Sequence, residues 1–286
     1  MISVLETVTP DGQVTEVLRH QGCEGQERLE APNWSPDGSS GGTWFLVNAG
    51  GRLWRVPAQS PRLEPIGTGI AGRCNNDHGF TRDGRILFGS HYEAEGAQIY
   101  AVPVAGIGAG QAPEKVSSAT PSWWHGLSPD GLTMTYPAAR GEKRQIDIYR
   151  RALAGGPETR LTEAAGHNDG PDFSHDGAQI YWNSDRAGHA QIWVMAADGG
   201  NQRQLFQDDR VNWFPHPSPC GRWLCWLSYP PGTEGHPADL PVWLMISDAD
   251  GGDRRVLREI TGGQGTINVP SWAPDGSAFA YIRYEP

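Results

Sequence analysis

Gly126-Leu127-Ser128-Pro129-Asp130-Gly131 is one of six related segments that decide the fold of this chain. The other five are Asn33–Gly38, Gly79–Gly84, Asp172–Gly177, His216–Gly221 and Ser271–Gly276. Their closing glycines are separated by 46, 47, 46, 44 and 55 residues. Each Pro-Asp-Gly among them is typical of a tight turn, because Pro fixes φ, Asp bonds its own backbone and Gly accepts a positive φ. Recurrence at this spacing predicts a repeated supersecondary unit.

The fourth repeat shows most clearly what one unit builds. Its β-branched and aromatic residues alternate between turn residues, which predicts four strands, over Pro171–Ser174, Gln179–Asn183, Gln191–Met195 and Arg203–Phe206. Four antiparallel strands in about 40 residues match one blade of a propeller. No segment has a convincing apolar period of ~3.6 residues. The sequence therefore predicts an all-β fold, a six-bladed β-propeller with four-stranded antiparallel blades.

The two ends of the sequence each supply part of one blade. The last repeat stops at Pro286 after only two strands, whereas Ile2–Leu5 and Val14–Leu18 flank a turn like the third and fourth strands of a blade. We therefore predict that the N-terminal strands complete the last blade and close the ring, which removes exposed strand edges. On this interpretation residues 1–286 form a single propeller domain.

Charge and composition limit the partners that we expect. The formal net charge of −10 disfavours nucleic acid and anionic membrane surfaces, which both select basic proteins. No apolar stretch approaches the ~18 residues of a membrane span. The N-terminus lacks a basic segment followed by an apolar run, so we expect a cytoplasmic monomer without a signal peptide; a mature periplasmic protein would have the same features.

The repeats resemble those of the TolB-type β-propeller family over nearly the whole chain. The fullest copy comprises Phe173–Gly177, Asn183–Gly188, Gln191–Trp193 and Asp198–Gly199. The resemblance implies the propeller fold and leaves the function open, because similar propellers dock proteins, gate peptidases or cleave sugars. It also implies that TolB itself carries an extra N-terminal domain. Strand residues begin at Ile2 here, so we expect that domain to be absent.

The tryptophans separate into two groups. One group recurs at equivalent positions and is expected in the core between blades. It comprises Trp54, Trp193 and Trp243, which we align with Tyr100 and Tyr149 on third strands, and Trp182 and Trp226 on second strands. The other group enters the third and fifth blades outside this pattern: Trp123, Trp124 and Trp213. These three are expected either to pack or to offer stacking surfaces to a ligand.

Polar side chains gather where the blades begin. The first strand of a propeller blade is innermost, so its N-terminal residues converge on the mouth of the central channel. The residues expected there are His78, His125, His167, Asp169, Asp172, His216, Asn33, Asn76 and Asn268. The longest insertion, Ser228–Leu240 in the fifth blade, is expected to emerge on the same face and cover the channel.

These residues allow three interpretations. They hydrate the channel or bond neighbouring backbone, they bind a polar ligand without metal, or His78, His125 and His216 hold a divalent ion such as Mn or Zn. We favour a non-enzymatic binding or scaffold protein without cofactor, for a small polar or carbohydrate ligand or a protein partner. The alternative is a metal-dependent enzyme similar to oligogalacturonate lyases, in which the metal neutralises a uronate and a base removes the neighbouring proton.

Overall fold

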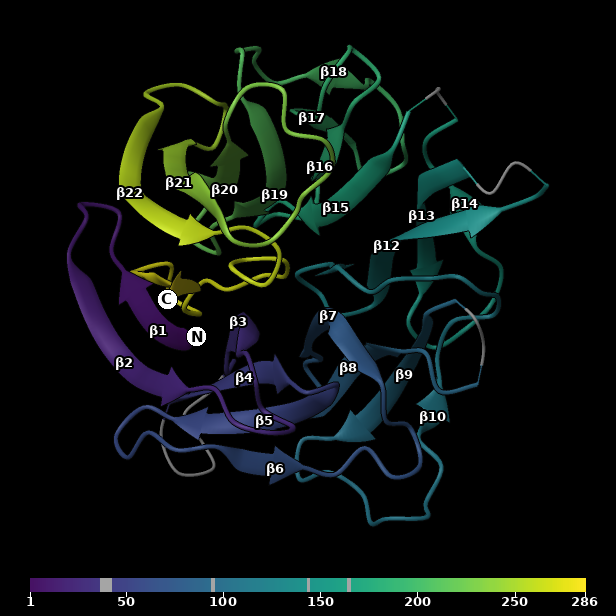
Figure 1. Ribbon diagram of the computed structural model, residues 1–286. Helices are drawn as coiled ribbons and strands as arrows, with labels where there is room; N and C mark the ends of the chain where they lie inside the picture. Colours follow the sequence, from purple (N-terminus) through teal and green to yellow (C-terminus); the bar gives the residue numbers. More distant parts are fainter. Residues whose placement is uncertain (37–42, 94–95, 143–144, 164–165) are drawn as a thin grey trace. The chain divides into compact units, whose positions relative to one another are not determined.

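The computed structural model describes residues 1–36, 43–93, 96–142, 145–163 and 166–286. Every regular element in these ranges is a β-strand, and the strands form six antiparallel sheets. Among the described residues, no helix is long and apolar enough to cross a bilayer. The fold is therefore the predicted six-bladed β-propeller (Figure 1). The chain divides into two compact units, residues 1–124 with 265–286 and residues 125–264.

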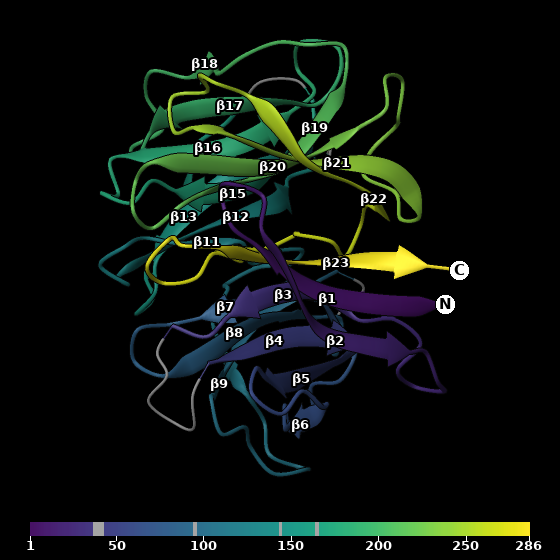
Figure 2. The same ribbon diagram turned by 90° about the vertical axis from the view of Figure 1, so that its left-hand side faces the viewer.

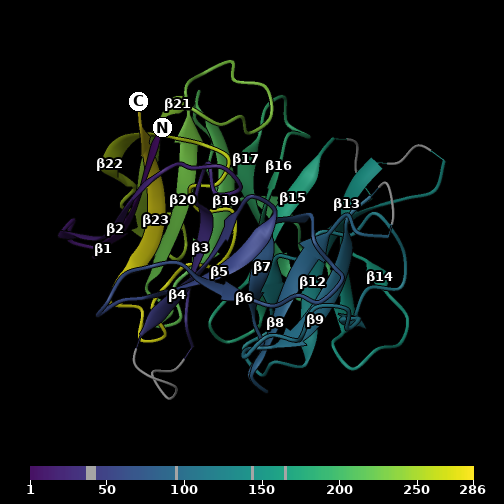
Figure 3. The same ribbon diagram turned by 60° about the horizontal axis from the view of Figure 1, so that its bottom comes forward.

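The first unit contains three sheets. Its first blade has the order β3-β4-β5-β6, with β3 (Glu30–Trp34), β4 (Trp44–Ala49), β5 (Arg52–Pro57) and β6 (Glu64–Ile66). The second comprises β7 (Cys74–Phe80), β8 (Arg85–Ser90), β9 (Gln98–Pro103) and β10 (Glu114–Lys115). Figure 3 shows β7, β8 and β9 side by side. The third sheet has the order β2-β1-β23 and comprises β1 (Ile2–Val8), β2 (Val14–Gln21) and β23 (Phe279–Glu285).

The second unit contains blades three to five. The third blade comprises β11 (Gly126–Leu127), β12 (Thr133–Arg140), β13 (Gln145–Ala152) and β14 (Thr159–Arg160). The fourth comprises β15 (Asn168–Phe173), β16 (Gln179–Ser184), β17 (Gln191–Ala196) and β18 (Arg203–Gln204). The fifth comprises β19 (Val211–Pro217), β20 (Trp223–Tyr229), β21 (Leu240–Asp248) and β22 (Arg255–Gly262). The four strands predicted for the fourth repeat are all present, within a few residues of the expected limits.

The two ends of the chain meet in the sixth blade. β1 pairs with β23 from Ile2 opposite Glu285 to Val8 opposite Phe279, and with β2 on its other edge. Figure 2 shows β1 beside β23 with the two termini next to each other. The first strand of this blade is reduced to a bridge between Trp272 and Phe279. The prediction that the N-terminal strands complete the last blade is confirmed.

The recurrent turns have the predicted backbone. The amide of Gly131 donates to the carbonyl of Ser128 at 2.7 Å, and Gly177 donates to Ser174 at 2.9 Å. These glycines have φ of 78° and 71°, in the left-handed region that favours glycine. The hairpin between the first and second strands therefore depends on the closing glycine of each repeat. In the first repeat, Asp37 and Gly38 lie outside the described residues.

Most of the repeated aromatic residues are buried between sheets, Trp193 and Trp243 are only partly buried, and one alignment differs from the prediction. Trp182 and Trp226 are fully buried, as predicted, and their indole N–H groups donate to Asn168 and Asn212. Trp182 lies opposite Trp193, but Trp226 lies opposite Met245 rather than Trp243. The prediction that Trp243 shares the position of Trp193 is therefore wrong by two residues. The insertion in the fifth blade obscures in the sequence where β21 begins. Spacing alone therefore predicted the wrong pairing register between β20 and β21.

We predict that β1 contributes strongly to stability through its buried face. Leu5 is fully buried in a cluster with Phe45 and Ile282, so Leu5→Ala should lower the free energy of unfolding by about 2–5 kcal/mol. The control is Leu132→Ala, because Leu132 is 67% exposed and its truncation should change stability by less than about 0.5 kcal/mol. Urea denaturation of both variants measures this. Similar losses for the two would contradict the role of β1.

Candidate functional site

In the fourth and fifth blades, a β-bulge near the start of the first strand positions the candidate residues. The pairing of β15 with β16 is interrupted between Asp169 and Asp172, and that of β19 with β20 between Trp213 and His216. Inside these bulges Gly170 and Phe214 both have a φ of 59°. Such a bulge bends the strand and re-aims its side chains, and bulges are frequent beside functional sites. At these bulges the side chains of the first strand therefore no longer alternate regularly between the two faces of the sheet, and the candidate site lies there.

Asp169 is the centre of a cluster in the second unit. Its Oδ2 lies 3.1 Å from Nε2 of His167, and its Oδ1 lies 3.5 Å from Nε2 of His125. Oδ1 also accepts the amide N–H of Gly170 at 2.7 Å. The side chain is only 14% exposed, and burial alone would raise its pKa. The hydrogen bond from His167 and the nearby imidazoles overcome this effect and hold the pKa of Asp169 well below its usual range.

His236 completes this cluster from the long connection between β20 and β21. Its ring centroid lies 4.5 Å from that of Trp213 and 5.1 Å from that of Phe214. Its Nδ1 lies 2.7 Å from Oε1 of Gln264. The neighbouring carbonyl of Pro237 accepts the hydroxyl of Tyr229 and the amide of Gln264, which fixes the connection. The charge of this third imidazole also lowers the pKa of Asp169, and the repeat pattern of the sequence does not predict this residue.

We call this cluster the Asp169 site. It consists of His125, His167, Asp169, Trp213, Phe214 and His236. The ring of His125 stacks on Phe214 at an interplanar angle of 12°, and that of His167 meets Trp213 edge-on at 5.4 Å. Aromatic rings therefore fix the orientation of each imidazole.

The histidines of the site differ in their charge. Burial lowers the pKa of His125 to about 4, although Asp169 opposes this shift, so His125 is neutral at physiological pH. Burial likewise lowers the pKa of His236. For His167, burial also favours the neutral ring, but the hydrogen bond to Asp169 outweighs it and raises the pKa. His167 is therefore the imidazole of this cluster whose protonated form Asp169 stabilises.

Asp172 and His216 form a second pair in the same unit. Nδ1 of His216 lies 3.1 Å from Oδ2 of Asp172, and both side chains are buried. Burial raises the pKa of Asp172, while the hydrogen bond to His216 opposes that shift. The amide of Phe173 also donates to Asp172, at 2.9 Å. These contacts join the first strands of the fourth and fifth blades.

The first unit holds the remaining predicted polar residues. Nδ2 of Asn33 donates to the carbonyl of Pro270 at 2.8 Å, which turns its Oδ1 toward Nδ1 of His78 at 2.6 Å. His78 is fully buried, and burial lowers its pKa to about 3. Asn76 accepts a hydrogen bond from Asn48, and Asn268 accepts one from the amide of Gly265. The hydrogen bonds of Asn76 and Asn268 match the interpretation in which the polar residues bond neighbouring groups of the protein.

The tryptophans outside the repeated pattern are mostly buried. Trp124 and Trp213 are each 2% exposed, and Trp123 is partly exposed. A side chain on Gly79 would collide with the ring of Trp124, at 2.1 Å from its tip, so the absence of a Cβ there makes room for the indole. Trp124 is thus a packed side chain rather than an open stacking surface. Trp213 is also packed, but its neighbours are the imidazoles of the Asp169 site.

The proposed metal ligands His78, His125 and His216 draw on both units, and this set stays a prediction. Among the described residues, no group of three or more His, Cys, Asp and Glu side chains could hold a metal ion. The Asp169 site therefore contains the residue types that bind transition metals, but its His and Asp side chains contact one another instead.

Comparison with known proteins identifies the family. Residues 80–236 match the profile of the TolB β-propeller domain, which is more than half of the chain. The chain belongs to the TolB β-propeller family. An uncharacterized protein of Agrobacterium fabrum is 43% identical over 262 residues, which cover 91% of this chain and 86% of that protein.

Two solved structures extend this comparison. A candidate TolB from Agrobacterium tumefaciens is 39% identical, with a TM-score of 0.92, and the match covers 100% of this chain and 99% of that one. TolB from Acinetobacter baumannii is 17% identical with a TM-score of 0.60, covering 90% of this chain and 63% of that one. At that identity the second likeness shows the fold alone.

We predict that Asp169 sets the titration of His167. Without the carboxylate, burial is opposed only by the charge of Asp185, so Asp169→Asn should lower the His167 midpoint toward its ordinary pKa of about 6.5 or below. The midpoint is measured by NMR of the imidazole Cε1–H signal against pH. Asp209→Asn is the matched control, because Asp209 is exposed and lies outside the Asp169 site. An unshifted His167 midpoint in Asp169→Asn would contradict this role of Asp169.

We also predict that buried His78 makes the protein acid-labile. Its folded pKa is about 3, so between pH 7 and pH 5 the unfolded chain binds a proton that the folded protein does not. Stability is therefore lost as pH falls through about 6.5, by about 2 kcal/mol per such histidine. His78→Gln should reduce the fall in unfolding free energy by about this amount, as measured by urea denaturation at both pH values. An identical fall in the two proteins would contradict the prediction.

Proposed function

We propose that this TolB-type propeller is a non-enzymatic binding protein whose Asp169 site takes a small polar ligand, with carbohydrates as the first class to test. The proposal deepens the family assignment, which by itself leaves the activity open. A polar side chain presented by a protein partner would use the same groups, and peptides therefore belong in the same test.

One observation carries this proposal: two partly exposed imidazoles flank Trp213, each with one ring nitrogen uncommitted. His167 uses Nε2 on Asp169, and His236 uses Nδ1 on Gln264. In the described part of the chain, neither His167 Nδ1 nor His236 Nε2 has a protein partner. A neutral His236 accepts a hydrogen bond at Nε2, and His167 donates one at Nδ1 when its ring is protonated. A ligand with adjacent hydroxyl groups can satisfy both.

The pKa values of Asp169 and His125 disfavour these two groups as general bases. A general base works best when its pKa lies near the working pH. The low pKa of Asp169 makes this carboxylate a weak base, and His125, with a pKa of about 4, is weak as well. The hydrogen bond between Asp169 and His167 instead fixes both side chains in one orientation. Such preorganisation reduces the entropy lost when a ligand binds.

The binding test uses purified protein and a panel of neutral sugars, oligogalacturonides and short peptides, screened by thermal shift and followed by calorimetry. For a ligand that binds, we expect His167→Ala and His236→Ala each to weaken binding by about tenfold, the loss of one hydrogen bond to a charged or buried group. His189→Ala is the matched control, because His189 is a partly exposed histidine of the same unit that bonds Asp208. Equal effects of all three variants would contradict the site.

A second measurement separates this proposal from the lyase-like alternative. The melting temperature is compared with and without chelator, manganese and zinc, and absorbance is followed for an unsaturated sugar product. We expect no metal dependence and no product. A metal that binds only the native state must raise the stability of that state. An increase of several degrees in the melting temperature with metal, together with product formation from oligogalacturonides, would therefore establish the enzyme instead.

A further inference from the structure

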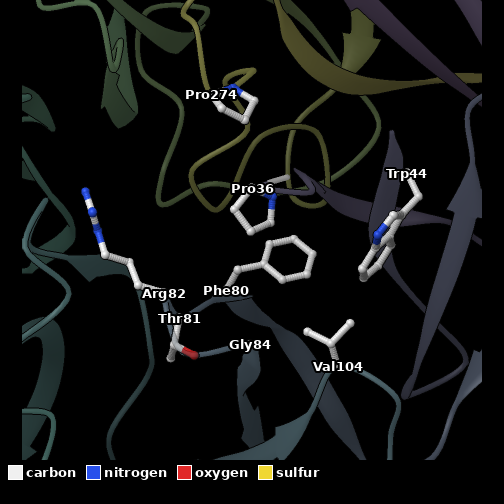
Figure 4. Close-up of a pocket in the computed structure, with 8 residues that line it drawn as sticks. All are labelled: Pro36, Trp44, Phe80, Thr81, Arg82, Gly84, Val104 and Pro274. Atoms are coloured by element: carbon white, nitrogen blue, oxygen red, sulfur yellow. The ribbon is translucent and has the colours of Figure 1, made fainter. Parts of the chain in front are cut away.

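A cavity lies in the first unit, at the end of the first strands where they enter their turns. Its volume is about 480 Å³. The lining residues are Pro36, Trp44, Phe80, Thr81, Arg82, Gly84, Val104 and Pro274, and Figure 4 shows them around one open space. The Asp169 site, by contrast, uses the starts of first strands. None of the residues assigned to that site lines this cavity.

About half of the cavity wall is apolar, and the aromatic rings and prolines make up that half. The rings of Trp44 and Phe80 meet edge-on, with centroids 5.0 Å apart and an interplanar angle of 87°. Pro36 and Pro274 belong to the recurrent turns of the first and last repeats, and Val104 follows β9. The volume lies in the ~300–1,000 Å³ range of small-molecule sites, which are apolar pockets with few polar groups. The cavity therefore fits the apolar part of a small ligand.

Arg82 is the one charged residue among the described residues that line the cavity. It occupies the turn position that is Pro in four of the other repeats, at Pro36, Pro129, Pro219 and Pro274. Its side chain is exposed, and among the described residues it has no ion-pair partner. The adjacent carboxylate of Asp83 is instead held by Arg85 at 2.9 Å and by Thr81. Asp275, beside Pro274, accepts the amide of Ser277. The guanidinium of Arg82 is thus available to a ligand.

The geometry points to a binding site for a small apolar carboxylate, such as an arylalkanoic acid. Its hydrocarbon or aromatic body would lie between Phe80, Trp44 and the two prolines, and its carboxylate would accept hydrogen bonds from Arg82. A planar guanidinium matches a carboxylate with two parallel hydrogen bonds. This site is independent of the function proposed for the Asp169 site.

The test uses ¹⁹F NMR with 3-(4-fluorophenyl)propionate as the probe and 3-(4-fluorophenyl)propan-1-ol as its neutral counterpart. The wild-type protein should bind the acid more tightly than the alcohol. Arg82→Gln should weaken the acid by about tenfold or more, the usual loss for a hydrogen bond to a charged group, and leave the alcohol nearly unchanged. Arg52→Gln is the matched control, because Arg52 is exposed in the same unit and does not line the cavity. Val104→Phe should weaken both probes by filling the space.

Three results would overturn the inference. They are equal affinity for the acid and the alcohol, equal effects of Arg82→Gln and Arg52→Gln, and unchanged binding of both probes in Val104→Phe. Absence of any binding at millimolar concentrations of the acid would also reject it. Displacement of the probe by a sugar that binds the Asp169 site would show that the two sites are not independent.

Discussion

The backbone pairing of β1 with β23 is the interaction on which the first unit depends. An unpaired strand edge exposes a row of N–H and C=O groups, which invites pairing with other chains. Here seven consecutive residues of β1, Ile2–Val8, pair with Phe279–Glu285, although the two strands lie at opposite ends of the sequence. The same pairing places Leu5 and Ile282 in one apolar cluster with Phe45 of the next blade. Hydrogen bonding and burial thus act together in this contact.

In the second unit the corresponding constraint is the burial of Asp169. A buried carboxylate is costly unless it is paired and hydrogen-bonded. Asp169 meets this requirement with His167, His125 and the amide of Gly170. The aromatic rings of Trp213 and Phe214 then hold the imidazoles in place. The site is therefore a consequence of one buried charge and the groups that neutralise it.

The sequence predicted the fold well because each repeat carries its own turn. The spacing of the closing glycines gave the number of blades, and the half-blade patterns at the two ends gave the pairing of β1 with β23. Register within the fifth blade was less predictable, since the insertion before β21 moved Trp243 away from the position of Trp193. Turn residues report local backbone geometry, but the point where a strand resumes after a long connection depends on tertiary packing.

The candidate site was only half predictable for a similar reason. Asp169, His125, His167 and Trp213 could be found because they begin blades, and the structure brings them together. The position of a residue in its repeat did not predict whether its side chain is buried. Trp124, for example, is packed against Gly79. His236 was missed although its insertion was noticed, because no repeat offers a counterpart for comparison. The contacts of a long connection depend on the side chains against which it packs, which for His236 are Trp213 and Phe214.

Departures from the repeat are therefore the best guide to function in this chain. Residues that recur satisfy a requirement common to all blades, such as the turn glycines or the buried Trp182 and Trp226. A residue that departs from the pattern is free of that requirement, so another constraint must explain it. His236 stands in an insertion and lowers the pKa of Asp169 through its charge, and Arg82 replaces a turn proline and lines a cavity. Both departures add a polar group beside aromatic walls, which is what a rigid scaffold needs in order to bind a ligand.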